Sequence, residues 1–300
     1  MIYDMIIVGA GPAGMTAAIY ALRANKSVLI LEKETIGGQM ASSPLIENYP
    51  GFKGISGSEL ANELYEQVDN LGGEIEIEEV LDIKEGKIKE VITDMGTHQG
   101  KTVVIATGAK YRRLGIENEE NFIGNGISFC VACDGAFYKG KTVAVIGGGN
   151  SAIINAIALS DICKKVYIVQ NLKDLTAEAN LKDRIREKKN VEITCDAIVK
   201  SINGKEKIES IDILINNKEE RNIVVDGMFE SIGLEAQNDF VEKCIKLNDY
   251  GYVETDEMCK TNKEGIYAAG DCRSKRIRQI TTATSDGSIS AINAIGYLNN

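Results

Sequence analysis

Short apolar runs, a glycine turn and a helical stretch follow one another at the start of this chain. Residues Met5 to Val8 form an apolar run of strand length, and a helical stretch covers Ala13 to Ala24 after the glycines. A second apolar run occupies Val28 to Leu31. This order predicts a strand, a tight turn, a helix and a second strand, which together make one right-handed βαβ unit.

The same pattern occurs a second time near the middle of the chain. Val143 to Ile146 form the first strand, Gly147 to Gly149 the turn, Asn150 to Ser160 the helix and Val166 to Val169 the second strand. A chain of 300 residues is also too long for one core of typical size. The sequence therefore predicts two nucleotide-binding folds, each in its own domain.

The rest of the chain supplies strands, a linker and a last helix. Segment 111–125 carries charges and glycines and is interpreted as a linker. In chain order, the other predicted elements are strand segments over 74–91, a strand over 103–108, antiparallel strands over 191–225, a strand over 266–271 and a helix over 285–298. This mixture of strands and helices indicates an α/β fold.

Composition and charge exclude several classes of protein. The hydrophobic fraction is 44% and the apolar runs reach only strand length, whereas a membrane-spanning helix needs about 20 consecutive apolar residues. The N-terminus enters a strand without the basic and apolar regions of a secretion signal, so we expect a cytoplasmic protein. The formal net charge of −10 argues against nucleic acid as a general partner.

The first glycine turn has the features of a dinucleotide-binding site. Gly9, Gly11 and Gly14 form the spacing G-x-G-x-x-G between a strand and a helix. The first glycine permits the tight turn, the second lets a pyrophosphate approach the backbone, and the third lets the helix pack on the strand. Glu32 ends the second strand and is placed to accept a hydrogen bond from a ribose hydroxyl. Together these residues predict dinucleotide binding.

Two of the seven cysteines are close enough in sequence to share chemistry. Cys130 and Cys133 have a C-x-x-C spacing that allows a reducible disulfide, and Asp134 follows them as a candidate proton donor or acceptor. Zinc would need four ligands, but the chain has no second C-x-x-C and one histidine, His98, which we expect in a solvated loop. The sequence therefore predicts a redox dithiol, no metal site, and mostly free thiols elsewhere.

The order and spacing of these motifs resemble the low-molecular-weight thioredoxin reductases over nearly the whole chain. The dithiol lies just ahead of the second glycine turn, whereas in relatives similar to glutathione reductase it lies inside the first domain. The residues that carry the resemblance are Gly9 to Gly14, Gly37-Gly38-Gln39, Glu47 to Phe52, Ala106-Thr107-Gly108, Cys130 to Gly135, Gly147 to Ala152 and Gly270-Asp271.

The resemblance implies an FAD domain made from both ends of the chain, with the dithiol domain inserted between them. Residues 1–113 and 245–300 would form the FAD domain, and residues 114–244 the inserted domain of the pyridine-nucleotide type. Both would have a Rossmann-like, three-layer ββα fold. The residues implied to bind FAD are Gly9, Gly11, Pro12, Ala13, Gly14, Glu32, Gly38, Gln39, Asn48, Thr107, Gly108, Gly270, Asp271, Arg278 and Gln279.

The resemblance also implies roles at the dithiol. Cys133 would face the flavin, Cys130 would attack the disulfide of thioredoxin, and Asp134 would act as an acid. A homodimer is implied as well.

The chain departs from the family in the inserted domain. NADPH-dependent members carry a His-Arg-Arg-x-x-x-Arg stretch whose arginines pair with the 2′-phosphate. Here residues 170–176 read Gln-Asn-Leu-Lys-Asp-Leu-Thr, and Gln170 is not the acidic residue that NAD would require. A group of similar flavin thioredoxin reductases takes electrons from ferredoxin, which is the donor that we expect. The alternatives are NAD(P)H at an atypical site, and a flavoprotein that binds or senses a partner without reducing thioredoxin.

A docking surface for ferredoxin should be basic, because ferredoxins are acidic. The net charge of the chain is negative, so such a surface must be local. We expect it at the first of two basic clusters, close in sequence to the implied FAD contacts. The first cluster is Arg273, Lys275, Arg276 and Arg278, and the second is Arg184, Arg186, Lys188 and Lys189.

Overall fold

The structure, a computed structural model, describes residues 1–299 and divides into two compact units. Unit 1 contains Met1–Lys110 and the chain from Glu235 onward, and unit 2 contains Tyr111–Leu234. The boundaries expected from sequence were after residue 113 and after residue 244. The second one differs because residues 235–244 pack in unit 1, where Val241 is fully buried in the core.

The sheet of unit 1 is mostly parallel and lies at the centre of that unit. Its strands run in the order β3-β2-β1-β6-β5-β4, and β17 pairs with β6. The strands are β1 (Ile2–Val8), β2 (Val28–Glu32), β3 (Glu74–Ile77), β4 (Val80–Lys84), β5 (Lys89–Thr93), β6 (Thr97–Ile105) and β17 (Ile266–Ala268).

Helices cover one face of this sheet, and apolar side chains are buried on both faces. Met5 and Ile7 of β1 face a core shared with α1 (Pro12–Arg23), α2 (Gly57–Asn70) and α7 (Ile280–Leu298). Ile6 and Val8 point to the other face, where side chains of β4 and β5 cover them. This alternation explains why β1, which is buried on both faces, appears in the sequence as a continuous apolar run.

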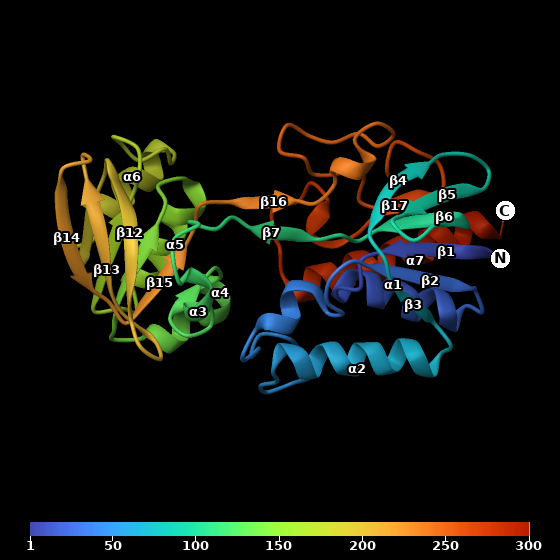
Figure 1. The fold of residues 1–300 in the computed structure, drawn as a ribbon, viewed down its shortest axis with the longest axis horizontal. Coiled ribbons are helices and arrows are strands. Elements are labelled where there is room, and N and C mark those ends of the chain that lie inside the picture. Colours follow the sequence, from blue (N-terminus) through green and yellow to red (C-terminus); the bar gives the residue numbers. More distant parts are fainter. Residues whose placement is uncertain (300) are drawn as a thin grey trace. The chain divides into compact units, whose positions relative to one another are not determined.

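Unit 2 has a five-stranded parallel sheet of its own, in the order β11-β10-β9-β15-β8. Helix α5 packs on one face of it, and the antiparallel sheet β12-β13-β14 packs on the other. Figure 1 shows these three strands as an outer layer of unit 2. The elements are β8 (Ile127–Ser128), β9 (Thr142–Ile146), β10 (Lys165–Val169), β11 (Val191–Thr194), β12 (Ala197–Gly204), β13 (Ile208–Ile215), β14 (Glu219–Val224), β15 (Gly227–Glu230), α3 (Glu119–Phe122), α4 (Val131–Asp134), α5 (Asn150–Ser160) and α6 (Ala179–Arg186).

Both units therefore have the three-layer ββα arrangement of a Rossmann-like α/β fold, which confirms the predicted fold class. The chain passes between the units through β7 (Ala109–Tyr111) and β16 (Leu234–Ala236), which pair with each other. Within the described residues, no helix is long and apolar enough to cross a membrane.

Several local expectations differ from the structure. Helix α2 was missed, although Ser56 and Glu59 form a capping box at its start, which is a helix signal in sequence. Segment 111–125 belongs to unit 2 and is ordered by Glu119, whose carboxylate accepts hydrogen bonds from the backbone N–H groups of Leu114, Gly115 and Ile116. His98 is not in a solvated loop: it lies on β6, and its Nε2 is 2.8 Å from Glu78 Oε2.

Candidate functional site

The glycine turn between β1 and α1 combines packing glycines with an open position. Gly9 has a φ of +109°, and a side chain at Gly14 would collide with the carbonyl oxygen of Gly9, so both residues must be glycine for the turn to form. Gly11 is different, because a Cβ atom there would meet nothing within 4 Å. Pro12 and Ala13 then begin α1. The start of α1 is therefore accessible to an anionic group such as a pyrophosphate.

Glu32 lies beside this turn, at the end of β2. Its Oε2 accepts a hydrogen bond from the backbone N–H of Ala10 at 2.8 Å, and its Oε1 accepts one from Glu34 at 2.9 Å. Each carboxylate oxygen can accept more than one hydrogen bond. Glu32 is thus held in place by backbone groups while keeping lone pairs for ribose hydroxyls.

Other residues expected to bind FAD gather at the same end of unit 1. A Cβ atom on Gly38 would lie 3.6 Å from the Cα of Gly11, so the loop that carries Gly38 and Gln39 adjoins the glycine turn. Asn48 Nδ2 donates to Gln279 Oε1 at 3.3 Å, which joins the loop around Asn48 to the start of α7. Residues far apart in sequence are therefore brought together here.

Asp271 presents an unsatisfied carboxylate oxygen in this region. Within the described chain its Oδ1 is buried without a hydrogen-bond partner, and burial raises the pKa of its carboxyl group. A buried oxygen of this kind normally has a partner, so a ligand hydroxyl would fit it. Arg278 Nε donates to the carbonyl oxygen of Asp271 at 3.4 Å, and its guanidinium lies 4.2 Å from the centre of the Tyr252 ring.

Asn238 ties the end of β6 to the segment that carries Asp271. Thr107 Oγ1 donates to Asn238 Oδ1 at 2.9 Å, and Asn238 Nδ2 donates to the carbonyl oxygen of Cys272 at 2.8 Å. Asn238 is fully buried. Thr107, Gly108, Gly270 and Asp271 are thus held near each other by an amide that the sequence did not single out.

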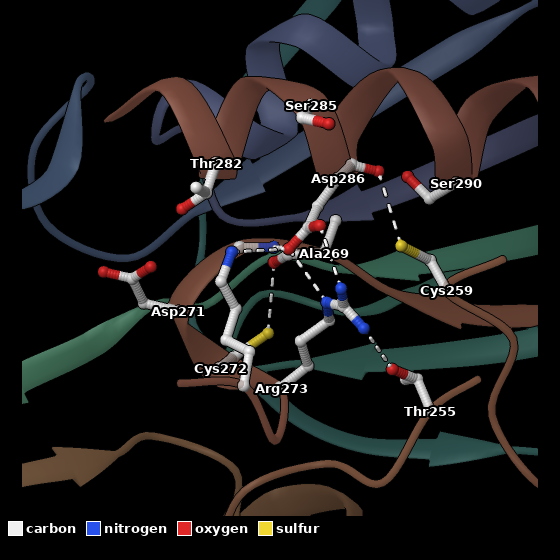
Figure 2. A network of polar contacts seen from close by, with 12 residues as sticks. Thr255, Cys259, Ala269, Asp271, Cys272, Arg273, Thr282, Ser285, Asp286 and Ser290 are labelled. Atoms are coloured by element: carbon white, nitrogen blue, oxygen red, sulfur yellow. Dashed lines mark hydrogen bonds and ion pairs between the residues drawn. The ribbon is translucent and has the colours of Figure 1, made fainter. Parts of the chain in front are cut away.

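A buried ion network next to Asp271 changes the interpretation of the first basic cluster (Figure 2). Arg273 donates through Nε and Nη2 to the two carboxylate oxygens of Asp286, at 2.8 and 3.0 Å, and Lys275 Nζ lies 2.8 Å from Asp286 Oδ2. The side chains of Arg273 and Lys275 are only 15% and 10% exposed. The expectation that these two residues form a docking surface is therefore wrong, because both side chains are turned inward and paired with Asp286 inside unit 1. Arg276 is the exposed member of that cluster.

The two cysteines of the C-x-x-C motif are joined by a disulfide at the start of α4. Ser128 Oγ donates to Asp134 Oδ2 at 2.6 Å and accepts from the backbone N–H of Cys130 at 3.2 Å. Burial raises the pKa of Asp134, and the hydrogen bond from Ser128 opposes that rise. Cys133 is exposed, and Cys130 is half-buried. The other five cysteines are free thiols.

The second glycine turn, between β9 and α5, has the side chain of Gln170 packed against its middle glycine. Gln170 is 4% exposed, and a Cβ atom on Gly148 would lie 2.6 Å from its Cδ. Its Nε2 points to the carbonyl oxygen of Asp174 at 3.4 Å. The backbone N–H of Thr176 donates to the carbonyl oxygen of Gly148 at 2.8 Å. Gln170 and Thr176 therefore lie against this turn, while a Cβ atom on Gly149, which corresponds to Gly11 of the first turn, would meet only Thr176 Oγ1 at 3.7 Å.

No group of three or more His, Cys, Asp or Glu side chains in residues 1–299 is arranged to hold a metal ion.

Comparison with known proteins identifies the family. The sequence model "Pyridine nucleotide-disulphide oxidoreductase" matches residues 3–287. Thioredoxin reductase of Bacillus subtilis is 42% identical over 304 residues, covering 99% of this chain and 95% of the relative. The crystal structure of thioredoxin reductase from Streptococcus pyogenes is 40% identical with a TM-score of 0.96, over 99% of this chain and 98% of that one. A ferredoxin-flavin thioredoxin reductase from Clostridium acetobutylicum is 30% identical with a TM-score of 0.54, over 99% and 98%.

The chain therefore belongs to the pyridine nucleotide-disulphide oxidoreductases, and within them to the low-molecular-weight thioredoxin reductase family. Proteins of this family are FAD-binding flavoproteins, so FAD is the cofactor. The open start of α1 and the unpartnered oxygen of Asp271 both fit that cofactor.

Sequence reasoning missed three residues that support these groups. Ser128 contacts Asp134, Asn238 contacts Thr107, and Asp286 contacts Arg273. Each pair except the first is separated by more than ten residues, and none belongs to a motif with a periodic or spacing signal. Only the three-dimensional structure shows these contacts.

Proposed function

We propose that this protein reduces thioredoxin, passing electrons through FAD and the Cys130–Cys133 disulfide, and that reduced ferredoxin is the electron donor. The observation that carries the first part is the disulfide itself, which stands at the start of α4 in a chain of the thioredoxin reductase family. A flavoprotein that only binds or senses a partner would not need this disulfide.

The residues that would hold FAD lie in unit 1. The turn from Gly9 to Gly14 would bind the pyrophosphate through backbone N–H groups, and Glu32 would accept from the adenosine ribose. Gln39, Asn48 and Asp271 would lie along the ribityl chain and pyrophosphate, and Arg278 and Gln279 near the flavin ring. When bound, FAD supplies the electron pair that reduces the disulfide. These assignments follow the family resemblance, and the open Gly11 and the unsatisfied Asp271 support them.

The dithiol chemistry is disulfide exchange. Two electrons break the Cys130–Cys133 bond, and the sulfurs leave as one thiol and one thiolate, with Asp134 supplying the proton. The Cys130 thiolate then attacks the disulfide of thioredoxin and forms a mixed disulfide, releasing one thioredoxin thiolate. The Cys133 thiol gives its proton to a thioredoxin sulfur and attacks Cys130, the second thioredoxin sulfur leaves, and the enzyme disulfide forms again. The second thioredoxin sulfur takes a proton from solvent, so oxidised thioredoxin gains two electrons and two protons in total.

A groove beside the disulfide supports a protein substrate. It has a volume of about 450 Å³ and lies in unit 2 between the turn after Cys130 and the exposed side of α5. Its walls are largely apolar, formed by Val131, Ala132, Gly135, Ala136, Ile154, Ala158 and Ile162 with Lys139 and Asn155. An apolar loop of thioredoxin could cover these side chains while its disulfide reaches Cys130.

The donor proposal rests on the residues that follow β10, beside the second turn. The stretch 170–176 has Lys173 as its one basic residue, so it lacks the paired arginines that bind a 2′-phosphate. Gln170 is buried against Gly148 and has no carboxylate for ribose hydroxyls. The similar clostridial protein whose structure is named a ferredoxin-flavin thioredoxin reductase supports the same donor. The retained glycines Gly147 and Gly149 favour the alternative, an NAD(P)H-dependent thioredoxin reductase.

The thioredoxin step can be tested with cysteine variants. Cys130→Ser should leave the flavin reducible but abolish thioredoxin reduction, because Cys133 alone cannot form and resolve the mixed disulfide. Cys133→Ser should uncouple the flavin from the disulfide. Cys163→Ser is a matched control, since Cys163 is a buried free thiol in the same unit. Near-normal thioredoxin turnover by either variant of the motif would refute the dithiol assignment.

We also infer that the chain forms a homodimer, as the family resemblance implies. A groove of about 480 Å³ on unit 1 runs between α1, α2 and α7, and its lining includes Tyr20, Tyr49 and Phe52. A second copy would cover these side chains, of which Tyr20 and Phe52 are exposed. Light scattering of the holoenzyme should give twice the mass of one chain, and a monomer at micromolar concentration would contradict the inference.

A further inference from the structure

Ser128 forms hydrogen bonds with both Asp134 and Cys130 at the dithiol site. It ends strand β8 and is 6% exposed. Its hydroxyl donates to Asp134 Oδ2 at 2.6 Å and accepts from the backbone N–H of Cys130 at 3.2 Å. A hydroxyl has one hydrogen to donate and two lone pairs, so both bonds can exist at once with the proton directed to the carboxylate. The side chain therefore bridges the acid and the backbone of the attacking cysteine.

The short turn of α4 is otherwise held by its own backbone. The N–H of Asp134 donates to the carbonyl oxygen of Cys130 at 2.9 Å, and the N–H of Cys133 points to Cys130 Sγ at 3.2 Å. These bonds fix the main chain of the motif but leave the Asp134 carboxyl free to turn about its side-chain torsions. Among the described residues, Ser128 is the side chain that donates a hydrogen bond to this carboxyl group.

We propose that Ser128 is a positioning residue of the dithiol: it holds the Asp134 carboxyl and the Cys130 backbone in one fixed arrangement for proton delivery. The proposal rests on the proposed function, because it assigns a task to Ser128 within the same disulfide chemistry. Its two hydrogen bonds go to the Asp134 carboxyl and to the backbone N–H of Cys130, so Ser128 acts through these groups.

The bond from Ser128 is stronger after the proton has moved. When two electrons break the Cys130–Cys133 bond, one sulfur takes the proton of the Asp134 carboxyl and becomes a thiol, and the other remains a thiolate. Asp134 is then a carboxylate, and a hydrogen bond to a charged acceptor is roughly twice as strong as one to a neutral acceptor. The hydroxyl thus stabilises the product of proton donation and offsets part of the cost of forming a charge in a buried place.

Two ionisable groups near Asp134 titrate well above neutral pH. Burial, and the negative charges of Asp134 and Asp226, raise the pKa of Tyr138 to about 12. Burial and Asp226 raise the pKa of the Cys163 thiol to about 11. The Lys141 ammonium lies 5.4 Å from the centre of the Tyr138 ring. Tyr138 and Cys163 therefore do not obscure the titration of the Asp134 carboxyl group.

The test compares Ser128→Ala with Ser128→Thr, which keeps the hydroxyl. Ser160→Ala is the matched control, because Ser160 is also buried in unit 2 and donates a 2.6 Å hydrogen bond, to the carbonyl oxygen of Ile157. Infrared titration of the oxidised holoenzyme measures the carboxyl band of Asp134, assigned by its loss in Asp134→Asn. This measurement needs neither an electron donor nor thioredoxin.

Removal of the hydroxyl should move the infrared midpoint of Asp134 to higher pH, because the hydrogen bond favours the ionised form and burial then acts alone. The rate at which dithiothreitol reduces the Cys130–Cys133 disulfide at neutral pH should fall about tenfold, as part of the roughly 100-fold that a placed acid contributes. Exchange of the already reduced enzyme with an aromatic disulfide does not use this proton, so its rate should change less. Ser128→Thr should restore the midpoint, and Ser160→Ala should leave it at the wild-type value.

An unchanged Asp134 midpoint in Ser128→Ala would overturn the proposal, and so would an equal effect of Ser160→Ala. If the threonine variant fails to fold, the alanine variant and the control still decide between these outcomes. Failure of the proposed function would look different: wild-type enzyme would then show the expected Asp134 titration and exchange with the aromatic disulfide, but would not reduce thioredoxin.

Discussion

Replacing Asp286 with asparagine should strongly destabilise unit 1. Asp286 accepts hydrogen bonds from Arg273, Lys275 and the backbone N–H of Gly270, and all three groups lie inside the fold. Asparagine has nearly the same volume, so the change removes a charge without opening a cavity. Breaking a buried ion pair by removing one partner costs about 3–5 kcal/mol, because the other charge stays buried and unpaired. Here two cations lose their partner, so we expect at least about 3 kcal/mol.

Removing the charge of Asp286 should lower both the free energy of unfolding and the amount of FAD that the protein retains. Urea denaturation followed by circular dichroism gives the free energy, and flavin absorbance after gel filtration gives the FAD content of each variant. FAD content should fall, because Asp286 anchors Gly270 next to Asp271. Glu85→Gln is the control: Glu85 forms a 2.8 Å pair with Lys263 that is 57% and 30% exposed, and its loss should cost less than about 1 kcal/mol.

The dependence on pH provides a second check of the same network. Burial acts to raise the pKa of Asp286, but hydrogen bonds from Arg273 and Lys275 hold it below the ordinary value of 3.8. A carboxyl group with a lowered pKa stabilises the fold above its unfolded pKa, and this contribution is lost as pH falls through the folded value. Wild type and Asp286→Asn should therefore converge in stability below about pH 4. A loss under about 1 kcal/mol at pH 7 would refute the reasoning.

Three further changes have expected outcomes. Gly11→Ala should fold normally but lose FAD, because its Cβ atom would enter open space at the start of α1. Gly14→Ala should fail to fold. Circular dichroism measures the folding of each variant, and flavin absorbance measures its FAD content. Glu230→Met should stabilise the protein by roughly 2 kcal/mol at pH 7 and by nothing near pH 4.5. Burial and then the charge of Glu119 raise the pKa of Glu230 to about 9. The stability of the wild type therefore falls as pH rises above 4.5, the ordinary pKa of a glutamate. Arg276→Glu should slow flavin reduction by ferredoxin at low salt more than at high salt. The control Lys189→Glu, in unit 2, should not slow it. If the two variants are reduced at equal rates, Arg276 is not part of the docking surface.

The sequence predicted the parts of the fold that depend on local pattern. The apolar runs at Met5 to Val8 and Val143 to Ile146 became buried parallel strands, and helix α5 has the predicted bounds, Asn150–Ser160. Each of these elements carries its own periodicity and its own glycine turn. Helix α7 begins at Ile280, five residues before the predicted start; Thr282 Oγ1 accepts a hydrogen bond from the backbone N–H of Gln279 at 3.1 Å, and glutamine has no strong preference for the capping position.

Short sequence motifs predicted one part of the site. The part formed by tertiary contacts could not be predicted from the sequence. The disulfide between Cys130 and Cys133 and the turn from Gly9 to Gly14 follow from short spacings. Arg273 and Lys275 look like an exposed basic cluster in sequence, because their partner Asp286 is more than ten residues away on α7. A charged residue near a long-range partner of opposite sign cannot be told from a solvated one by local pattern alone.

Anaerobic reduction of the flavin by separate donors is the most direct test of the proposed function. The enzyme with FAD bound is mixed in a stopped-flow cell with reduced ferredoxin, NADPH or NADH, and flavin absorbance is recorded together with the reduction of added thioredoxin. We predict that reduced ferredoxin bleaches the flavin and drives thioredoxin reduction, while NADPH and NADH leave the flavin oxidised, because residues 170–176 lack the paired arginines and the acidic residue that bind these nucleotides. Rapid bleaching by NADPH at micromolar concentration, with ferredoxin inactive, would contradict this and would assign the chain to the NADPH-dependent reductases.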